Sequence, residues 1–244
     1  MELITVSDYA ELSNQCALMI KKFVDEKPDA SIVLAMGNTP LGTYEVLTEM
    51  KKRGEFDPSQ LTIYQLDGYL GLEPSDPRSL EGWLRKTVIE PWGILESQFV
   101  KLPENSDHPE AVCLDYETKV KEAGGFDLAV LGLGPNGHLG FNEPPSSAFA
   151  PTRVVPLTKE SLISNAIYWG GMEHVPTMSM TAGMNLLLSS CQIILLVNGG
   201  HKKEIFEQTL RGKIDDSIPS SHLQSHGNVK IIADKLALPG EVAK

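Results

Sequence analysis

Short apolar runs alternate along the chain with longer segments in which apolar residues recur every three or four positions. Because neighbouring positions in the runs are apolar, both sides of each strand must be buried, as in parallel sheets. The longer segments have the period of amphipathic helices. The predicted strands are 3–6, 31–35, 61–66, 128–131, 178–181, 191–197 and 229–233. We therefore expect an α/β fold with three layers, a mostly parallel Rossmann-like sheet with helices on both faces, and one domain spanning 1–244.

Capping residues place the starts of the first two helices. Asp8 precedes the first helical segment, and Glu11 stands where the second partner of a capping box is found. Thr39 is a favourable N-cap for the second helix, and Pro40 is a favourable first residue. Other helices are predicted at 78–89, 109–123, after Gly200 and at 217–226, and a loop at 68–71.

One long stretch has neither the strand nor the helix period. Residues 146–172 are polar and contain Pro151, Pro156, Gly170 and Gly171. We expect irregular structure here, forming a lid or an insertion over the functional site, because long connections in compact domains usually carry function.

Composition and charge narrow the possible partners. The 244 residues are 41% hydrophobic, as in ordinary globular proteins, and the formal net charge of −11 disfavours binding to nucleic acid or to an anionic membrane. The N-terminus has no basic region or long apolar core, so we expect no signal peptide and a cytoplasmic protein. Cys16, Cys113 and Cys191 lack metal-binding spacing and are predicted to be buried small hydrophobic residues, with a nucleophilic role as the alternative.

The most informative segment runs from 126 to 144, FDLAVLGLGPNGHLGFNEP. A predicted strand ends there in a glycine-rich turn that carries Asn136, His138 and Glu143. Ligands of open α/β sheets bind beyond the carboxyl ends of strands, so a histidine and a carboxylate at this place indicate acid–base chemistry on a small molecule. A purely structural turn is the alternative, but it would require neither side chain.

The same glycines match a dinucleotide-binding fingerprint, at Gly132, Gly134 and Gly137. That fingerprint needs a helix directly after the turn. Pro144 and Pro145 follow within a few residues. We therefore do not expect a nicotinamide cofactor.

Three other predicted strand ends also carry polar residues. Gly37, Asn38 and Thr39 lie between a strand and a helix, Asp67 directly follows a strand, and Lys202 lies in the first turn of a later helix. Each has an ordinary alternative: a ligand-free connection, an aspartate that caps a turn, and a solvated lysine. The free N–H groups of a helix start, together with a lysine, favour a bound anion. Because these ends share one edge of the sheet, their coincidence favours a single site.

These segments resemble the glucosamine-6-phosphate isomerase/deaminase family, which shares its fold with the 6-phosphogluconolactonases. The resemblance covers nearly the whole chain and rests on LAMGNTPLGTY, QLDGYLGL, LGLGPNGHLGFNEP and the Gly-Gly-His-Lys turn ending at Lys202. Within the family, KPDASIVLAMGNTPLGTY, LGLGPNGHLGFNEP and SIPSSHLQSH look most like the galactosamine-6-phosphate branch.

The resemblance implies a role for the matching polar residues. Asp67 would move the proton between C1 and C2 of the sugar. His138 would assist ring opening, and Glu143 would orient His138. Asn136 belongs to this catalytic set, at a position where the glucosamine enzymes usually have aspartate.

The resemblance also implies how the substrate is held. The turn from Gly37 to Thr39, with Asn38 between them, and Lys202 would bind its phosphate, and the reaction needs no cofactor and no metal. Two departures from the family pattern accompany this match. Gly68 stands where a second acidic residue usually follows the catalytic aspartate, and a lid arginine is replaced near Ile167.

We therefore expect an enzyme that converts galactosamine 6-phosphate to tagatose 6-phosphate and ammonia. The alternatives are a glucosamine-6-phosphate deaminase, a 6-phosphogluconolactonase, in which a histidine would activate water, and a non-catalytic sugar-phosphate sensor. Its only expected partner is the small sugar phosphate, with homo-oligomers left open.

Overall fold

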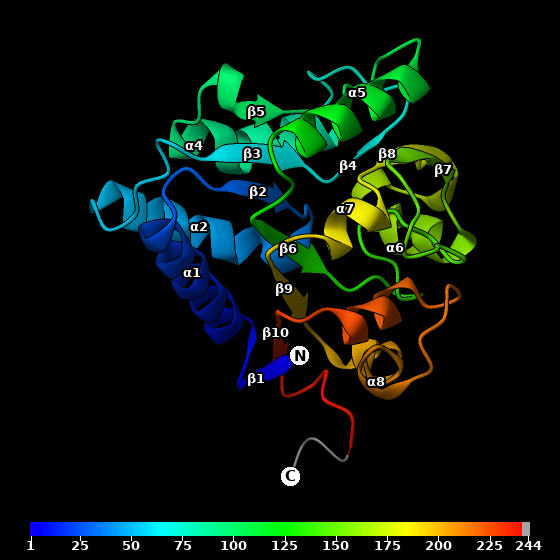
Figure 1. Ribbon diagram of the computed structural model, residues 1–244. Helices are drawn as coiled ribbons and strands as arrows, with labels where there is room; N and C mark the ends of the chain where they lie inside the picture. The colour runs from blue at the N-terminus through cyan, green and yellow to red at the C-terminus, as the bar shows by residue number, and fades with distance from the viewer. Residues whose placement is uncertain (241–244) are drawn as a thin grey trace.

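The computed structural model describes residues 1–240, and its centre is a seven-stranded sheet in which every neighbouring pair runs parallel (Figure 1). The strand order is β1-β10-β9-β6-β2-β3-β5, so β1 lies at an edge. The bounds are β1 Glu2–Val6, β2 Ser31–Leu34, β3 Thr62–Gln65, β5 Phe99–Val100, β6 Leu128–Gly132, β9 Gln192–Val197 and β10 Val229–Asp234.

Helices cover both faces of this sheet. Successive residues of β2 alternate between two apolar clusters: Ile32 packs with helices α1 and α2, whereas Val33 packs with α5 and α8. The helices are α1 Tyr9–Glu26, α2 Asn38–Lys52, α3 Leu80–Leu84, α4 Glu90–Trp92, α5 Pro109–Glu122, α6 Lys159–Trp169, α7 Met184–Leu188 and α8 Lys203–Arg211. A π-helical turn, Arg85–Ile89, joins α3 to α4, and 3₁₀ turns lie at Glu96–Gln98, Met172–His174, Gly200–Lys202 and Pro219–Ser225. The three-layer α/β prediction is confirmed.

A second, antiparallel sheet was not predicted. It consists of β4 Asp67–Tyr69, β8 Met178–Thr181 and β7 Arg153–Pro156, in the order β4-β8-β7. The loop prediction for 68–71 is therefore wrong at its start, because β4 pairs with β8. Its strand β8 coincides with the predicted strand 178–181, whereas β4 and β7 were not predicted.

The segment 146–172 is also more regular than predicted. It contains β7 and α6, which begins at the N-cap Thr158 and ends at Gly170 in the left-handed conformation. The apolar side of α6 is weak: Ile163 and Ile167 are exposed, and Trp169 is buried. The helix period is therefore hard to see in the sequence.

The predicted helix starts are correct to within two residues. The Asp8 side chain caps α1 by accepting a hydrogen bond from the Glu11 N–H. The Glu11 carboxylate accepts from the Ser7 N–H, one residue before the position that the capping-box prediction implies. Helix α2 begins at Asn38 with Gly37 as N-cap, so the N-cap prediction for Thr39 is wrong.

Two of the cysteines are buried and one is not. Cys16 and Cys113 are buried and free, as predicted, whereas Cys191 is free but exposed. Cys191 directly precedes β9 and lies at the amino edge of the sheet, before the buried part of this strand begins. Within residues 1–240, none of the helices has the length and hydropathy needed to cross a membrane.

Candidate functional site

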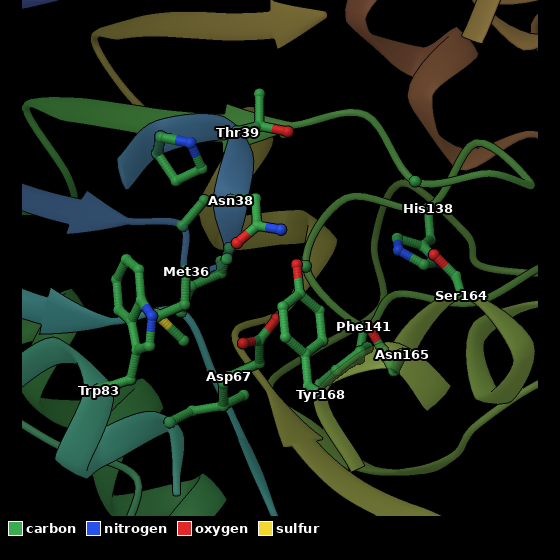
Figure 2. A pocket seen from close by; sticks show the side chains of 18 of the residues that line it. Met36, Asn38, Thr39, Asp67, Trp83, His138, Phe141, Ser164, Asn165 and Tyr168 are labelled. Atoms are coloured by element: carbon green, nitrogen blue, oxygen red, sulfur yellow. The ribbon is translucent and has the colours of Figure 1, made fainter. Parts of the chain in front are cut away.

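The carboxyl ends of the central strands surround a cavity of about 340 Å³, a volume typical of small-molecule sites (Figure 2). Six of the eight candidate residues line it: Gly37, Asn38, Thr39, Asp67, His138 and Lys202. Asn136 and Glu143 lie behind His138 and do not line the cavity. The segments that were predicted to share one edge of the sheet therefore line one cavity in the structure.

Asp67 is placed where the chain leaves the large sheet. Strand β3 ends at Gln65, and Asp67 opens β4 by pairing with Thr181. This crossing between sheets buries the carboxylate, which is 7% exposed, beside the backbone of Gly140. Burial, and secondly the charge of Glu104, raise the pKa of the Asp67 carboxyl to about 8. A carboxyl in this environment readily accepts a proton.

His138 is held by a hydrogen-bonded network on the side away from the cavity. Its Nδ1 lies 3.2 Å from the Glu143 carboxylate and 3.2 Å from the Ser161 hydroxyl. Asn136 Nδ2 and the Thr158 hydroxyl also donate to Glu143, over 2.8 and 3.2 Å. Burial raises the pKa of Glu143, but the hydrogen bond and charge of His138 and further hydrogen bonds outweigh it and lower this pKa to about 2. An ionised Glu143 therefore fixes the orientation of the imidazole.

Two glycines make room for these groups. A Cβ atom at Gly134 would lie 2.1 Å from the imidazole Cδ2 of His138, which no side chain allows. Gly140 has a φ of +59°, and a Cβ there would lie 3.3 Å from an Asp67 carboxylate oxygen. The glycine-rich turn thus brings the histidine and the aspartate to one cavity.

The opposite end of the cavity is suited to an anion. Gly37, with a φ of +99°, turns the chain so that α2 starts at the cavity wall. Helix starts offer free N–H groups and a positive dipole end. Lys202 lies on the same wall, and burial lowers the pKa of its ammonium group to about 8. Within residues 1–240 no carboxylate forms an ion pair with it. An anionic ligand would supply the missing counter-charge.

Several residues at the site were not found from the sequence. Arg78 lines the cavity and places its guanidinium 4.6 Å from the ring centre of Trp169, at the end of α6. Tyr168 also lines the cavity, and Figure 2 shows its hydroxyl pointing toward Asn38. For Tyr168 the sequence offered one local signal: Thr158 is a favourable N-cap residue and marks the start of the helix that carries Tyr168.

Chemically, the cavity combines a proton-accepting carboxylate, a histidine oriented by a second carboxylate, and an anion-binding end. Among the residues that the structure describes, no three His, Cys, Asp or Glu side chains gather in a way that would hold a metal ion. The arrangement suits proton transfer on a small phosphorylated molecule.

Comparison with known proteins agrees with this geometry. Residues 7–231 match the family described as glucosamine-6-phosphate isomerases/6-phosphogluconolactonase. The glucosamine-6-phosphate deaminase of Halothermothrix orenii is 37% identical over 238 residues, which are 97% of this chain and 98% of that protein. That of Thermoanaerobacter sp. (strain X514) is also 37% identical, over 97% of this chain and 94% of its own length.

Solved structures give the same relationship. A monomeric glucosamine-6-phosphate deaminase superposes with a TM-score of 0.95 and 34% identity over 100% of both chains. The 6-phosphogluconolactonase of Trypanosoma cruzi has a TM-score of 0.79 at 19% identity, covering 97% of this chain and 95% of that one, and therefore supports the fold alone. Because the family match extends over most of the sequence and the relatives align along nearly all of it, this chain belongs to the family of glucosamine-6-phosphate isomerases and 6-phosphogluconolactonases.

Proposed function

We propose that the protein is a glucosamine-6-phosphate deaminase, which converts glucosamine 6-phosphate and water to fructose 6-phosphate and ammonia. The observation that carries this proposal is the buried Asp67 carboxyl in the same cavity as the oriented His138. The relatives that cover nearly the whole chain are named for this reaction, which supports the choice of substrate.

The phosphate of the substrate would bind at the start of α2 and at Lys202. Both lie on the cavity wall, and Lys202 has no carboxylate partner among the described residues. Anchoring this remote group positions the reacting carbons and contributes to kcat as well as to affinity.

His138 would open the sugar ring as a general acid/base, with Glu143 and Asn136 as positioning residues behind it. Asp67 would then take the proton from C2 and return it to C1, which converts the aldose to a ketose-type imine. Addition of water at C2 and loss of ammonia complete the reaction, and atoms balance without a redox partner.

The environment of Asp67 supports an amino sugar over a lactone. Burial, and secondly the charge of Glu104, raise the pKa of this carboxyl to about 8. An amino group at C2 of the substrate can accept the proton of the Asp67 carboxyl. The resulting ammonium group is a cation that lies next to the Asp67 carboxylate. A lactone brings neither, and lactone hydrolysis needs no base at C2.

Galactosamine 6-phosphate is the second candidate, supported by the segments that resemble that branch. Two departures from the glucosamine pattern, at Asn136 and Ile167, lie outside the cavity lining. Asn136 lies behind Glu143, and Ile167 is 79% exposed on α6. Together with the names of the relatives, this favours glucosamine 6-phosphate, so the galactosamine assignment remains an untested prediction.

Segment 146–172 is proposed to act as a lid within a single domain. Its helix α6 contributes Ser164, Asn165 and Tyr168 to the cavity lining, and its first turn binds Glu143 through Thr158. Closure of this helix would exclude water from the ring-opened intermediate.

The proposal is tested by measuring ammonia release from both hexosamine 6-phosphates and, in parallel, hydrolysis of 6-phosphogluconolactone. We expect kcat/KM for glucosamine 6-phosphate to exceed that for the galactose epimer by about tenfold or more, a difference of about 1.4 kcal/mol. The opposite preference would establish the galactosamine assignment, and lactone hydrolysis without ammonia release would contradict both.

A further inference from the structure

A second buried carboxyl group lies behind Asp67 and outside the cavity. Glu104, in the connection between β5 and α5, is 1% exposed. One of its oxygens, Oε1, accepts hydrogen bonds from the Glu81 N–H over 2.7 Å, the Ser79 hydroxyl over 3.3 Å and the Gln65 side-chain amide over 3.4 Å. The carboxyl is therefore held in one orientation.

The other oxygen has no such partner. Glu104 Oε2 is buried and makes no hydrogen bond within residues 1–240. Arg85 and Lys101, the cations that contact the neighbouring Glu81, form ion pairs with Glu81 and Glu96 and, among the described residues, none with Glu104. An unpartnered buried carboxylate oxygen is costly and uncommon in native proteins, and its retention calls for a functional reason.

The backbone beside Asp67 is shaped around this group. A Cβ atom on Gly68 would lie 2.8 Å from Glu104 Cγ, so the absence of a side chain at position 68 leaves the room that Glu104 occupies. The Gln65 amide joins the Asp67 main chain to the Glu104 carboxyl: its Nε2 donates to the Asp67 backbone carbonyl over 2.9 Å and to Glu104 Oε1 over 3.4 Å.

Gln65 itself cannot turn freely. Its Oε1 accepts from the Leu102 N–H over 3.1 Å, and its carbonyl accepts from the Tyr116 hydroxyl over 2.7 Å. The Asp67 main chain and the Glu104 carboxyl are thus held by the same hydrogen-bonded frame.

We propose that Glu104 is a positioning residue for the reaction, whose buried carboxylate acts through the protein interior on Asp67 and increases its affinity for the substrate proton. This inference rests on the proposed function, in which Asp67 carries the proton between C2 and C1. Glu104 does not touch the substrate, because it lies outside the cavity lining.

The electrostatics agree in direction with this geometry. Burial raises the pKa of Glu104 to about 7, against the hydrogen bonds that lower it. Burial and then the Glu104 charge raise the pKa of Asp67. The other titratable or charged groups around the pair or in the cavity are Tyr69, Arg78, Glu81, Tyr116, His138, Tyr168 and Lys202.

Removing the Glu104 charge should therefore shift the pKa of Asp67 in a defined direction. Without a neighbouring negative charge, Asp67 loses its proton at lower pH. The acidic limb of the kcat/KM profile, where activity falls because the base becomes protonated, then moves to lower pH. A weaker base also transfers the C2 proton more slowly, so kcat on the plateau falls.

The test is the pH profile of ammonia release by Glu104→Gln, which keeps the shape and an acceptor for the Glu81 N–H. We expect the acidic limb to move down by roughly half to one pH unit. The matched control is Glu117→Gln, a 6%-exposed carboxylate on α5 bound by Thr152 and Asn185 and outside the cavity. The control should lose stability without moving the limb.

A limb that stays in place in a folded Glu104→Gln enzyme would overturn the inference, since a merely structural role changes stability or kcat alone. Should that variant not fold, the reciprocal coupling is measured in Asp67→Asn. Infrared difference titration should then show Glu104 ionising at lower pH than in the wild type, and an unchanged midpoint would also refute the coupling. Failure of the wild type to release ammonia from either sugar would instead refute the proposed function.

Discussion

Replacing Asp67 with asparagine is expected to stabilise the folded protein while removing its activity. An aspartate carboxyl ordinarily has a pKa of 3.8, and burial raises that of Asp67 to about 8 in the folded state. The folded protein therefore binds this proton more tightly than the unfolded chain. The sign follows: the contribution of Asp67 to stability is fully present below the unfolded pKa and is lost as the pH rises toward about 8.

The magnitude follows from the same two pKa values. Each pH unit between them changes the free energy of unfolding by about 1.4 kcal/mol, so the loss reaches at most about 4 kcal/mol at pH 7. Asparagine carries no charge and avoids this loss, but its amide N–H groups lack partners, which costs about 1–3 kcal/mol. We expect a net gain of about 1–3 kcal/mol at pH 7, or several degrees in Tm.

The assay is urea unfolding of wild type and Asp67→Asn across pH 4 to 8. The gain from the substitution should increase with pH over this window. As a matched control, Asp127→Asn removes a carboxylate that accepts from the Ser31 N–H over 2.8 Å and from Lys27 over 2.6 Å, and it should lose stability. A gain in Asp67→Asn that did not change with pH, or a loss at pH 8, would refute the reasoning.

Three further predictions concern the rest of the site. Burial lowers the pKa of Lys202 to about 8, so the KM of the wild type for the phosphorylated sugar should rise above that pH. Lys202→Met should raise KM far more than it lowers kcat, and its KM should no longer depend on pH in this range. Glu143→Gln should lower kcat by about 10²–10⁴-fold in ammonia-release assays. Because the net pKa shift of Glu143 is downward, to about 2, this variant should also lose about 1–3 kcal/mol of stability at pH 7 in urea unfolding, and the difference should shrink as the pH falls from about 4.5 toward 2. Gly134→Ala would place a Cβ atom 2.1 Å from the His138 ring, so a crystal structure should show the imidazole displaced, and steady-state assays a fall in kcat of at least tenfold.

The large sheet could be predicted because its strands are buried on both faces. Runs such as 128–131 and 191–197 are almost entirely apolar, and a central parallel strand has that requirement. Of the small sheet, strand β8 was predicted as 178–181, but its pairing was not, since β4 has the sequence DGY and derives its strand conformation from pairing with β8. Tertiary pairing overrides local preference there.

The candidate site was predictable in part for a similar reason. Asp67, His138 and Lys202 follow strands of one sheet, and parallel strands bring their carboxyl ends to one edge. Arg78 and Tyr168 come from segments whose direction is decided by packing, such as the stacking of Arg78 on Trp169. No sequence spacing encodes that contact.

Glu104 shows the limit most clearly. In the sequence it is one of two acidic residues in a polar connection, with nothing to mark it as buried. Only the structure shows its carboxyl packed against Gly68, with one oxygen unpartnered among the described residues.

The central claim is that Asp67 carries a proton between C2 and C1 of a hexosamine 6-phosphate. It is tested most directly by running the reaction on glucosamine 6-phosphate in deuterated water, with NMR analysis of the sugar and a parallel assay of ammonia. The proton held on Asp67 exchanges with solvent in a fraction of turnovers, so we expect the wild type to release ammonia and to place deuterium at C1 of part of the fructose 6-phosphate. Asp67→Asn should bind substrate without exchange at C1 or C2. Exchange at the wild-type rate in Asp67→Asn would contradict the account.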